Sequence, residues 1–284
     1  MITMQKLPIA LISSHGSLTI PPELDGRIAL TPEQIFNEAD AYLNDIFDFR
    51  DRVLYLETFP YSRAIIDVNR PADSQLHHRI GDGVVKRQTS YGRPVYHPRM
   101  EPEANLEQYL IHHYWQPWHD RLSEIEHDPR VKLVIDCHSM AAVGPDAFDD
   151  PMQLRPRVQT GNLGDYTGKL YPPRQRISAP ADITVLLADE LGRQLADIPA
   201  LTETGKTTAV NQPFSGGWNL WAHGHTRQPW LMIELNRALY IGRQHGSSPI
   251  VPSDPTRIAL LRERIWTALT AVSEYTLTNL SMVN

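Results

Sequence analysis

The sequence feature that most constrains the fold of this chain is a short apolar run followed directly by ionisable residues. Residues 131–135 are nearly all apolar and β-branched, and segment 136–139 then reads Asp-Cys-His-Ser. Such runs are typical of buried parallel strands, whose carboxyl ends carry the ligand sites of α/β proteins. Because side chains alternate along a strand, Asp136 and His138 should share a face, where the carboxylate could orient the imidazole as a metal ligand or general base. The fragment alone fits equally well a helix N-cap at Ser139 beside a hydrogen-bonded histidine.

The length and net charge of the chain limit the kinds of fold and binding partner that it can have. Its 284 residues suffice for one large α/β domain or two small ones with a sizeable apolar core. A net charge of −6 gives no electrostatic footprint for nucleic acid or an anionic membrane, but local arginines could still hold a small anionic substrate. The single cysteine, Cys137, excludes an intrachain disulfide and a cysteine-rich zinc site. We find no signal-peptide pattern and no apolar stretch of membrane-spanning length, so we expect a cytoplasmic protein, with its oligomeric state open.

Apolar runs alternate with helical patterns along the chain. Four further runs are typical of strands: residues 8–12, 52–57, 64–68 and 231–235. Helical patterns cover residues 31–49, 103–126, 183–195 and 254–280. Thr31 before Pro32 is a typical N-cap and first-turn pair, and Pro117 interrupts the second helix. Two stretches should be irregular, residues 72–102 as an excursion over the surface and residues 145–180. Strands alternating with helices predict one α/β domain with a largely parallel sheet.

Polar side chains follow four of the predicted strands. They are His15, the pair Asn69–Arg70, Asp136 with His138, and Glu234. In a parallel sheet these strand ends meet at one edge, so the side chains should converge on one cleft. Two histidines and a carboxylate form a three-ligand catalytic zinc site with the fourth position left for water. A separate carboxylate can take a proton from that water, and arginines can hold an anionic substrate.

Seven short motifs occur in order from Ser13 to Arg237. They are Ser13–Gly16, Asn37–Asp40, Ser62–Pro71, Trp115–Asp120, Asp136–Met140, Gly161–Gly164 and Ile233–Arg237. Each is weak alone, but the ordered set is specific, and on it the chain resembles the N-formylglutamate amidohydrolase (N-formylglutamate deformylase) family. The resemblance implies one catalytic domain over residues 1–284. It also implies an α/β fold of three layers, α/β/α, with a mixed, mostly parallel sheet like that of the zinc carboxypeptidases and aspartoacylases.

The resemblance further implies a metal site. One Zn²⁺ per chain would be held by His15, His138 and an acidic residue of the segment 38–40. We favour Asp40 over Glu38 because it aligns better with the acidic position of the family. The alternative is that Asp40 faces solvent on the first turns of a helix. Asp136 would orient His138.

The resemblance also assigns catalytic and substrate-binding roles. Glu234 matches the general base or acid of the family, and Arg63 is suited to stabilising an oxyanion, although a structural role is an alternative. Asn69 and Arg70 resemble a pair that grips a substrate carboxylate, and a guanidinium suits that geometry. A surface arginine paired with an aspartate is the alternative for Arg70.

Two further residues are candidates for substrate binding. His119 lies in the Trp-x-Pro-Trp-His-Asp motif and is as compatible with packing as with a substrate contact. Asn162, in Gly-Asn-Leu-Gly, would either line the cleft or cap a turn.

One segment departs from the pattern of the family, which has Gly-Gly followed by a Thr-Arg-His-Tyr-Gly-like run. Residues 216–224 here read Gly-Gly-Trp-Asn-Leu-Trp-Ala-His-Gly, with Trp221 and Ala222 at the arginine and histidine positions. A shift of one or two positions would let His223 or His225 compensate. The departure leaves the accepted acyl group and amino acid open.

These observations predict a zinc-dependent amidohydrolase. It would cleave the linear amide bond of N-formyl-L-glutamate to formate and L-glutamate, in histidine catabolism by family analogy. One alternative is a zinc-dependent deacylase or carboxypeptidase-like hydrolase of another N-acyl amino acid. Another is a non-catalytic binding protein on the same fold, which the presence of Glu234 together with all three ligands disfavours.

Overall fold

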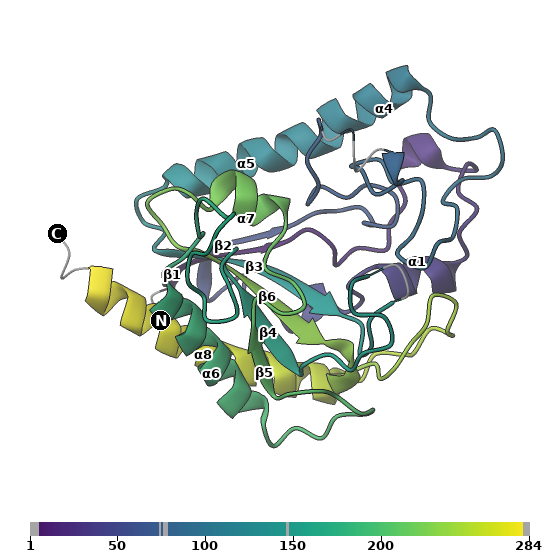
Figure 1. Cartoon of the computed structure of the whole chain (residues 1–284). Helices are drawn as coiled ribbons and strands as arrows, with labels where there is room; N and C mark the ends of the chain where they lie inside the picture. Colours follow the sequence, from purple (N-terminus) through teal and green to yellow (C-terminus); the bar gives the residue numbers. More distant parts are fainter. Residues whose placement is uncertain (1–5, 74, 76–78, 146–147, 281–284) are drawn as a thin grey trace.

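The chain is built around a six-stranded sheet, seen in a computed structural model that describes residues 6–73, 75, 79–145 and 148–280 (Figure 1). The strands are β1 (Leu7–Ser13), β2 (Val53–Thr58), β3 (Leu133–Met140), β4 (Val158–Gly161), β5 (Thr208–Val210) and β6 (Trp230–Asn236). Their order across the sheet is β2-β1-β3-β6-β4-β5. Neighbouring strands are parallel except β4 and β6, which are antiparallel. The predicted α/β class with a mixed, mostly parallel sheet is therefore confirmed.

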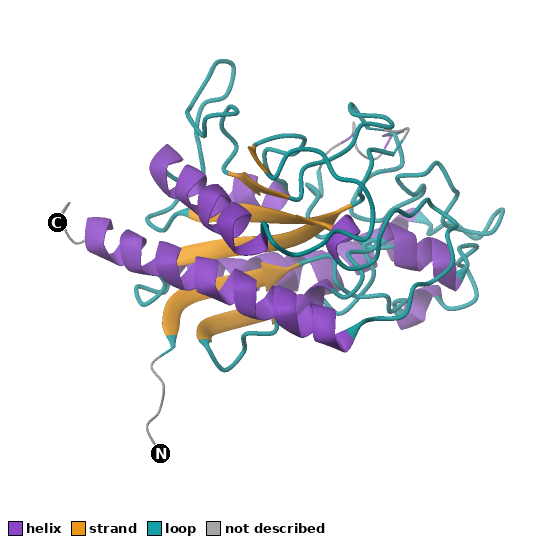
Figure 2. Cartoon of the chain, turned by 90° about the horizontal axis from the view of Figure 1, so that it is seen from below, coloured by secondary structure: helices purple, strands orange, loops and turns teal. Residues whose placement is uncertain are grey.

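Helices cover both faces of the sheet (Figure 2). One face packs against α6 (Ala181–Leu195) and α8 (Pro255–Leu280). The other packs against α4 (Ala104–Leu110), the π-helical segment η2 (Ile111–Trp115), α5 (Gln116–His127) and α7 (Trp218–His223). Further short helices include η1 (Pro22–Leu24), α1 (Pro32–Glu38), α2 (Leu43–Ile46) and η3 (Arg237–Leu239). In the described part of the chain, no helix combines the length and hydropathy that crossing a membrane requires.

The alternating side chains of β3 explain both how the sheet packs and where its chemistry lies. Ile135 and Cys137 are fully buried in the apolar layer formed with α6 and α8. Val134 belongs to the opposite apolar layer, beneath α5. Asp136 and His138 follow Val134 on that second face, since successive side chains of a strand point to opposite faces. Cys137 is thus a buried core residue, as predicted.

Most of the predicted elements are confirmed. The strands expected at residues 8–12, 52–57, 131–135 and 231–235, and the helices expected at 183–195 and 254–280, all form. The helix expected at 103–126 runs from α4 through η2 to α5, and Pro117 lies in the first turn of α5, directly after the π-helical segment. The third predicted strand is wrong, because residues 64–68 form a buried turn in which Ile66 makes an isolated bridge with Val85.

The predicted helix over residues 31–49 is broken in the middle. α1 begins as expected, with Thr31 in a capping box and Pro32 in its first turn. It ends at Glu38, and α2 begins after Tyr42, whose φ of 62° is left-handed. The break takes Asp40 out of the helix and buries it completely, so it does not face solvent.

Residues 80–102 form turns, bends and isolated bridges, but they are not only a surface excursion. Val84, Val85, Val95 and Tyr96 are buried and join the apolar layer beneath α5. Lys86 is also buried. Residues 148–180 are irregular too, apart from β4, which was not predicted.

Candidate active site

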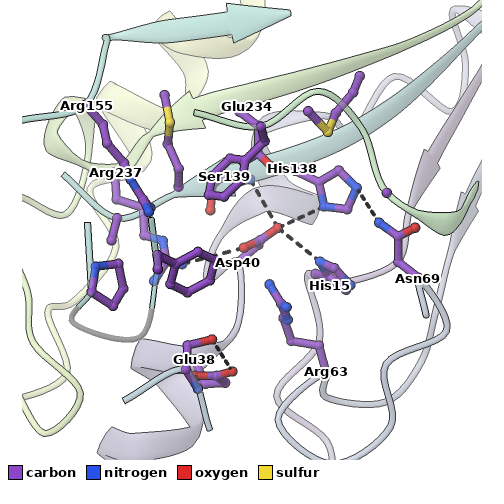
Figure 3. A pocket seen from close by; sticks show the side chains of 18 of the residues that line it. His15, Glu38, Asp40, Arg63, Asn69, His138, Ser139, Arg155, Glu234 and Arg237 are labelled. Atoms are coloured by element: carbon purple, nitrogen blue, oxygen red, sulfur yellow. Dashed lines mark hydrogen bonds and ion pairs between the residues drawn. The ribbon is translucent and has the colours of Figure 1, made fainter. Parts of the chain in front are cut away.

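Three predicted metal ligands meet at one point in the structure (Figure 3). His15 follows β1, Asp40 lies between α1 and α2, and His138 is in β3. One potential ligand atom from each lies within 4.8 Å of the others, and all three residues are buried. Asp40 Oδ2 is 3.8 Å from His15 Nδ1 and 3.4 Å from His138 Nδ1. The geometry therefore groups Asp40, and not Glu38, with the two histidines.

Backbone hydrogen bonds hold Asp40 in this position. Its N–H donates to the carbonyl oxygen of His15 at 3.0 Å. Its Oδ2 accepts from the backbone N–H of Ser139 at 3.1 Å. Because the chain is not helical between α1 and α2, Asp40 can form hydrogen bonds both with His15, which follows β1, and with β3.

Each histidine is oriented by a buried aspartate on its far nitrogen. His15 Nε2 lies 2.7 Å from Asp67 Oδ1, and His138 Nε2 lies 3.0 Å from Asp136 Oδ1. These contacts favour the proton on Nε2 and leave the Nδ1 lone pair free to bind a metal, an arrangement typical of histidine ligands. His15 Nδ1 is buried without a hydrogen-bond partner among the described residues. Asp136 was predicted to orient His138; the role of Asp67 was missed, although its place in the Ser62–Pro71 motif could have drawn attention to it.

The electrostatics of the group favour a bound cation. Burial, helped by the charge of Arg63, lowers the pKa of His15 to about 4. For His138, burial is outweighed by Asp136 and Asp40, which raise its pKa well above the ordinary value. Burial opposes ionisation of Asp40, but the two histidines lower its pKa nevertheless. The group thus keeps a buried carboxylate and attracts positive charge, either a proton on His138 or a metal ion in its place.

A separate carboxylate lies beside this group. Glu234 in β6 is paired in register with His138 in β3, so the two side chains share a face of the sheet. Burial raises the pKa of Glu234 to about 7, against the opposing charges of His138 and Arg155. Glu234 Oε2 is buried and has no hydrogen-bond partner among the described residues. A carboxyl group that is easily protonated and deprotonated near neutral pH is suited to general acid and base catalysis.

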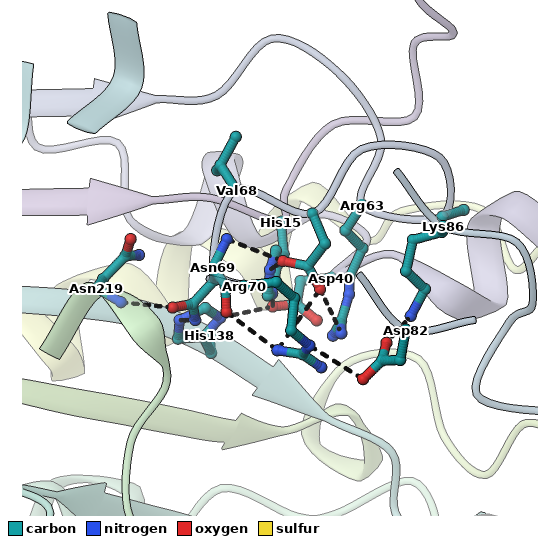
Figure 4. A network of polar contacts seen from close by, with 12 residues as sticks. His15, Asp40, Arg63, Val68, Asn69, Arg70, Asp82, Lys86, His138 and Asn219 are labelled. Atoms are coloured by element: carbon teal, nitrogen blue, oxygen red, sulfur yellow. Dashed lines mark hydrogen bonds and ion pairs between the residues drawn. The ribbon is translucent and has the colours of Figure 1, made fainter. Parts of the chain in front are cut away.

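A pocket of about 250 Å³ opens onto these residues and is lined by four arginines. Two of them, Arg63 and Arg70, were predicted. Arg63 Nη2 donates to Asp67 Oδ2 at 3.1 Å. Arg70 Nε donates to Asp82 Oδ2 at 3.0 Å, and its Nη1 lies 3.7 Å from Asp67 (Figure 4). Asn69 also lines the pocket, with Nδ2 3.3 Å from His138 Nε2.

The other two pocket arginines, Arg155 and Arg237, were not predicted as site residues. Arg237 Nη1 donates to the carbonyl oxygen of Asn37 at 2.9 Å, and Nη2 lies 3.6 Å from Asp40 Oδ1. Arg155 pairs with Asp150 through two hydrogen bonds. The pocket therefore carries positive charge on more than one wall, as an anionic substrate requires.

Glu38, the alternative ligand, belongs to a different network. Both its oxygens accept hydrogen bonds from Ser90, from the N–H and from Oγ, each at 2.9 Å. Lys86 Nζ lies 3.4 Å from Glu38 and also pairs with Asp82, the partner of Arg70 (Figure 4). Glu38 thus supports the wall that holds Arg70.

Sequence comparison then decides the family. The sequence profile of the N-formylglutamate amidohydrolase family matches residues 7–241. The chain belongs to this family. Among its relatives, N-formylglutamate deformylase of Pseudomonas aeruginosa is 23% identical over 248 residues, covering 84% of this chain and 84% of the relative. The enzyme of the same name from Pseudomonas putida is 24% identical over 219 residues, covering 75% and 73%.

Solved structures show the same fold. The crystal structure of N-formylglutamate amidohydrolase from Ralstonia eutropha superposes with a TM-score of 0.71 at 19% identity, covering 97% of this chain and 96% of the other. A gene product of Agrobacterium tumefaciens superposes with a TM-score of 0.60 at 16% identity, covering 97% and 91%. The N-formylglutamate amidohydrolase fold thus extends over nearly the whole chain.

Two predicted substrate-binding residues lie outside the pocket of this family member. His119 is buried between α5 and α7, where Nδ1 is 2.9 Å from His223 Nε2 and Nε2 is 2.9 Å from the carbonyl oxygen of Val68. Asn162 is buried in a turn, where Nδ2 donates to the carbonyl oxygens of Gly168 and Ala179. Neither side chain lines the pocket, so the structure favours the packing and turn-capping alternatives.

The segment that departs from the family pattern contacts the site through Gly216, Gly217 and Asn219, whose Nδ2 donates to Asp136. Gly216 and Gly217 line the pocket, and Trp221 is exposed. The residue after Gly217 and Trp218 is Asn219, whose N–H donates to Asn69 Oδ1 at 2.7 Å. His223 lies in the buried pair with His119 and so does not replace a pocket histidine.

Proposed function

We propose that this chain hydrolyses N-formyl-L-glutamate to formate and L-glutamate. The observation that carries the proposal is the buried group of His15, Asp40 and His138, with Glu234 beside it in a pocket lined by arginines. Family membership favours the same reaction, and by family analogy we place it in histidine catabolism. Because the residues involved range from His15 to Glu234 in the chain, we infer one catalytic unit.

The donor set fits a zinc ion. Two imidazole nitrogens and one carboxylate oxygen form a typical three-ligand catalytic site, in which the fourth position is open. His15 Nδ1 is buried without a hydrogen-bond partner among the described residues, a cost that a bound cation would remove. When bound, zinc would supply Lewis-acid activation of water and of the formyl carbonyl.

The remaining chemistry follows from the residues of the chain. Glu234, in its ionised form, would accept a proton from the attacking water and then give it to the leaving amine of glutamate. Arg63, fixed by Asp67, would donate hydrogen bonds to the oxyanion that develops on the formyl carbonyl. Asn69 and Arg70 would bind a carboxylate of the substrate and so orient the amide bond.

A substrate panel with matched variants tests the proposal. Purified protein should contain stoichiometric zinc and prefer N-formyl-L-glutamate over N-acetyl and N-succinyl amino acids and over other N-formyl amino acids. His138→Ala should lose both metal and activity, whereas the exposed His113→Ala should keep both. Stoichiometric zinc in His138→Ala would refute the ligand role. Preference for another acyl amino acid would refute N-formyl-L-glutamate as the substrate and would indicate a related deacylase.

A further inference from the structure

Arg155 is held in the pocket wall by a carboxylate and two aromatic rings. Its Nε and Nη2 donate to Asp150 at 2.7 and 2.8 Å, and the side chain is 4% exposed. The guanidinium lies over the rings of Phe148 and Phe214, with its central carbon 5.3 and 4.8 Å from the ring centroids. A carboxylate and two aromatic rings thus fix the guanidinium in place.

This arrangement leaves a hydrogen-bonding edge of Arg155 available. A guanidinium has five N–H donors, and Asp150 takes one from Nε and one from Nη2. Nη1 makes no hydrogen bond within the described residues. The end-on pair, Nη1 with the second N–H of Nη2, has the geometry that matches a carboxylate with two parallel hydrogen bonds.

The position of Arg155 would also allow it to bind a second anionic group of a substrate. In the view of Figure 3, it lies on the opposite side of Asp40 from Arg63 and Asn69. Arg63 and Arg70 both form ion pairs with Asp67. Because Asp67 contacts His15, the positive charges of these two arginines lie close to the proposed metal ligands. Arg155 instead pairs with Asp150, and in the described part of the chain no hydrogen bond or ion pair joins it to His15, Asp40 or His138.

We propose that Arg155 binds the γ-carboxylate of the substrate and thereby selects glutamate. This inference rests on the proposed function. N-formylglutamate carries two carboxylates, of which the α-carboxylate is close to the scissile amide and suits Asn69 and Arg70 beside His138. The γ-carboxylate is two methylene groups further along the side chain and needs a second cation. Arg155 supplies that cation with its end-on pair of donors.

The test compares two substrates that differ only in the γ group. N-formyl-L-glutamine has a neutral amide of almost the same shape as the γ-carboxylate. Removing the partner of a buried, hydrogen-bonded charge typically costs 2–5 kcal/mol, so Arg155→Gln should lower kcat/KM for N-formyl-L-glutamate by about 30- to 4000-fold. For N-formyl-L-glutamine, kcat/KM should stay within about threefold, because the lost charge has no partner there.

Two further variants complete the test. Arg155→Lys keeps the charge but lacks the paired donors, so it should retain part of the preference for glutamate, and it serves if Arg155→Gln does not fold. Arg174→Gln, at an exposed arginine that bonds Ser215 next to the pocket glycines, should leave the preference unchanged. Equal losses on both substrates, or no loss on either, would overturn the role of Arg155.

Failure of the proposed function would give a different result. In that case the wild-type protein would hydrolyse neither compound, and calorimetric binding of the two compounds would replace kcat/KM. Tighter binding of N-formyl-L-glutamate than of N-formyl-L-glutamine, lost in Arg155→Gln, would still support the γ-carboxylate site. No difference in binding between the two compounds would refute it.

Discussion

Asp67 offers the sharpest test of how the site is held together. It is fully buried, accepts from His15 Nε2 at 2.7 Å and from Arg63 at 3.1 Å, and lies 3.7 Å from Arg70. The substitution Asp67→Asn keeps the shape of the side chain but removes the negative charge that all three neighbours face. It should therefore weaken both the metal site and the fold.

The two effects have different sizes. Loss of the carboxylate partner of a ligand histidine typically lowers metal affinity 10- to 100-fold, or about 1.4–2.7 kcal/mol. Removing one partner of a fully buried ion pair costs about 3–5 kcal/mol of stability. Arg63 and Arg70 retain 15% and 20% exposure of their side chains, and Arg70 keeps Asp82, so we expect a smaller loss of about 2–3 kcal/mol in the free energy of unfolding.

Two measurements separate these effects. Competition between the metal-free protein and a coloured chelator gives the Zn²⁺ affinity, and urea denaturation of the metal-free protein gives the free energy of unfolding. Asp120→Asn, at an exposed aspartate of α5 that bonds Gln116, serves as the control. Wild-type Zn²⁺ affinity in Asp67→Asn would refute the claim that this carboxylate orients a ligand.

Three further predictions concern single residues of the site and the core. Arg70→Lys should raise KM about tenfold with little change in kcat, because lysine lacks the guanidinium fork; unchanged KM in initial-rate kinetics would remove Arg70 from the substrate site. The acidic limb of kcat/KM should have its midpoint at or below about 7, since Glu234 works only when ionised and a bound cation lowers its raised pKa; a midpoint clearly above 7, or a profile without an acidic limb, would contradict this role. Burial raises the pKa of Cys137, so its thiol should react with Ellman's reagent only after denaturation, and Cys137→Ala should keep kcat within about twofold; rapid labelling of the native protein would show that the residue is accessible.

The sequence predicted the centre of the sheet well because local pattern and tertiary structure agree there. Ile135 and Cys137 of β3 and the leucines of β6 face α6 and α8, whereas Asp136, His138 and Glu234 fall on the other face. The alternation of side chains along the strand is therefore enough to predict that Asp136 and His138 lie on the same face. The antiparallel strand β4 has a weak apolar pattern, Val-Gln-Thr-Gly, and depends on long-range pairing with β6. Such pairing leaves little trace in the local sequence.

Two parts of the site could not be read from local pattern. The apolar spacing of residues 31–49 continues across the break at Asp40, which long-range hydrogen bonds to His15 and Ser139 fix. Arg155 follows an irregular stretch. Its position in the pocket wall depends on contacts with Asp150 and two aromatic rings, which the local sequence pattern does not predict. Residues 64–68 look like a strand because their apolar side chains are buried, but the burial is that of a turn.

The two-faced packing of β3 has a consequence for insertions and deletions. A one-residue slip in a strand moves every later side chain to the opposite face of the sheet. An insertion just before Ile135 would turn Asp136 and His138 into the apolar layer against α6 and α8, and would turn Ile135 and Cys137 into the pocket. Core and chemistry would be lost in the same step. We therefore expect this strand to tolerate conservative substitutions at Ile135 or Cys137, but no change of length ahead of His138.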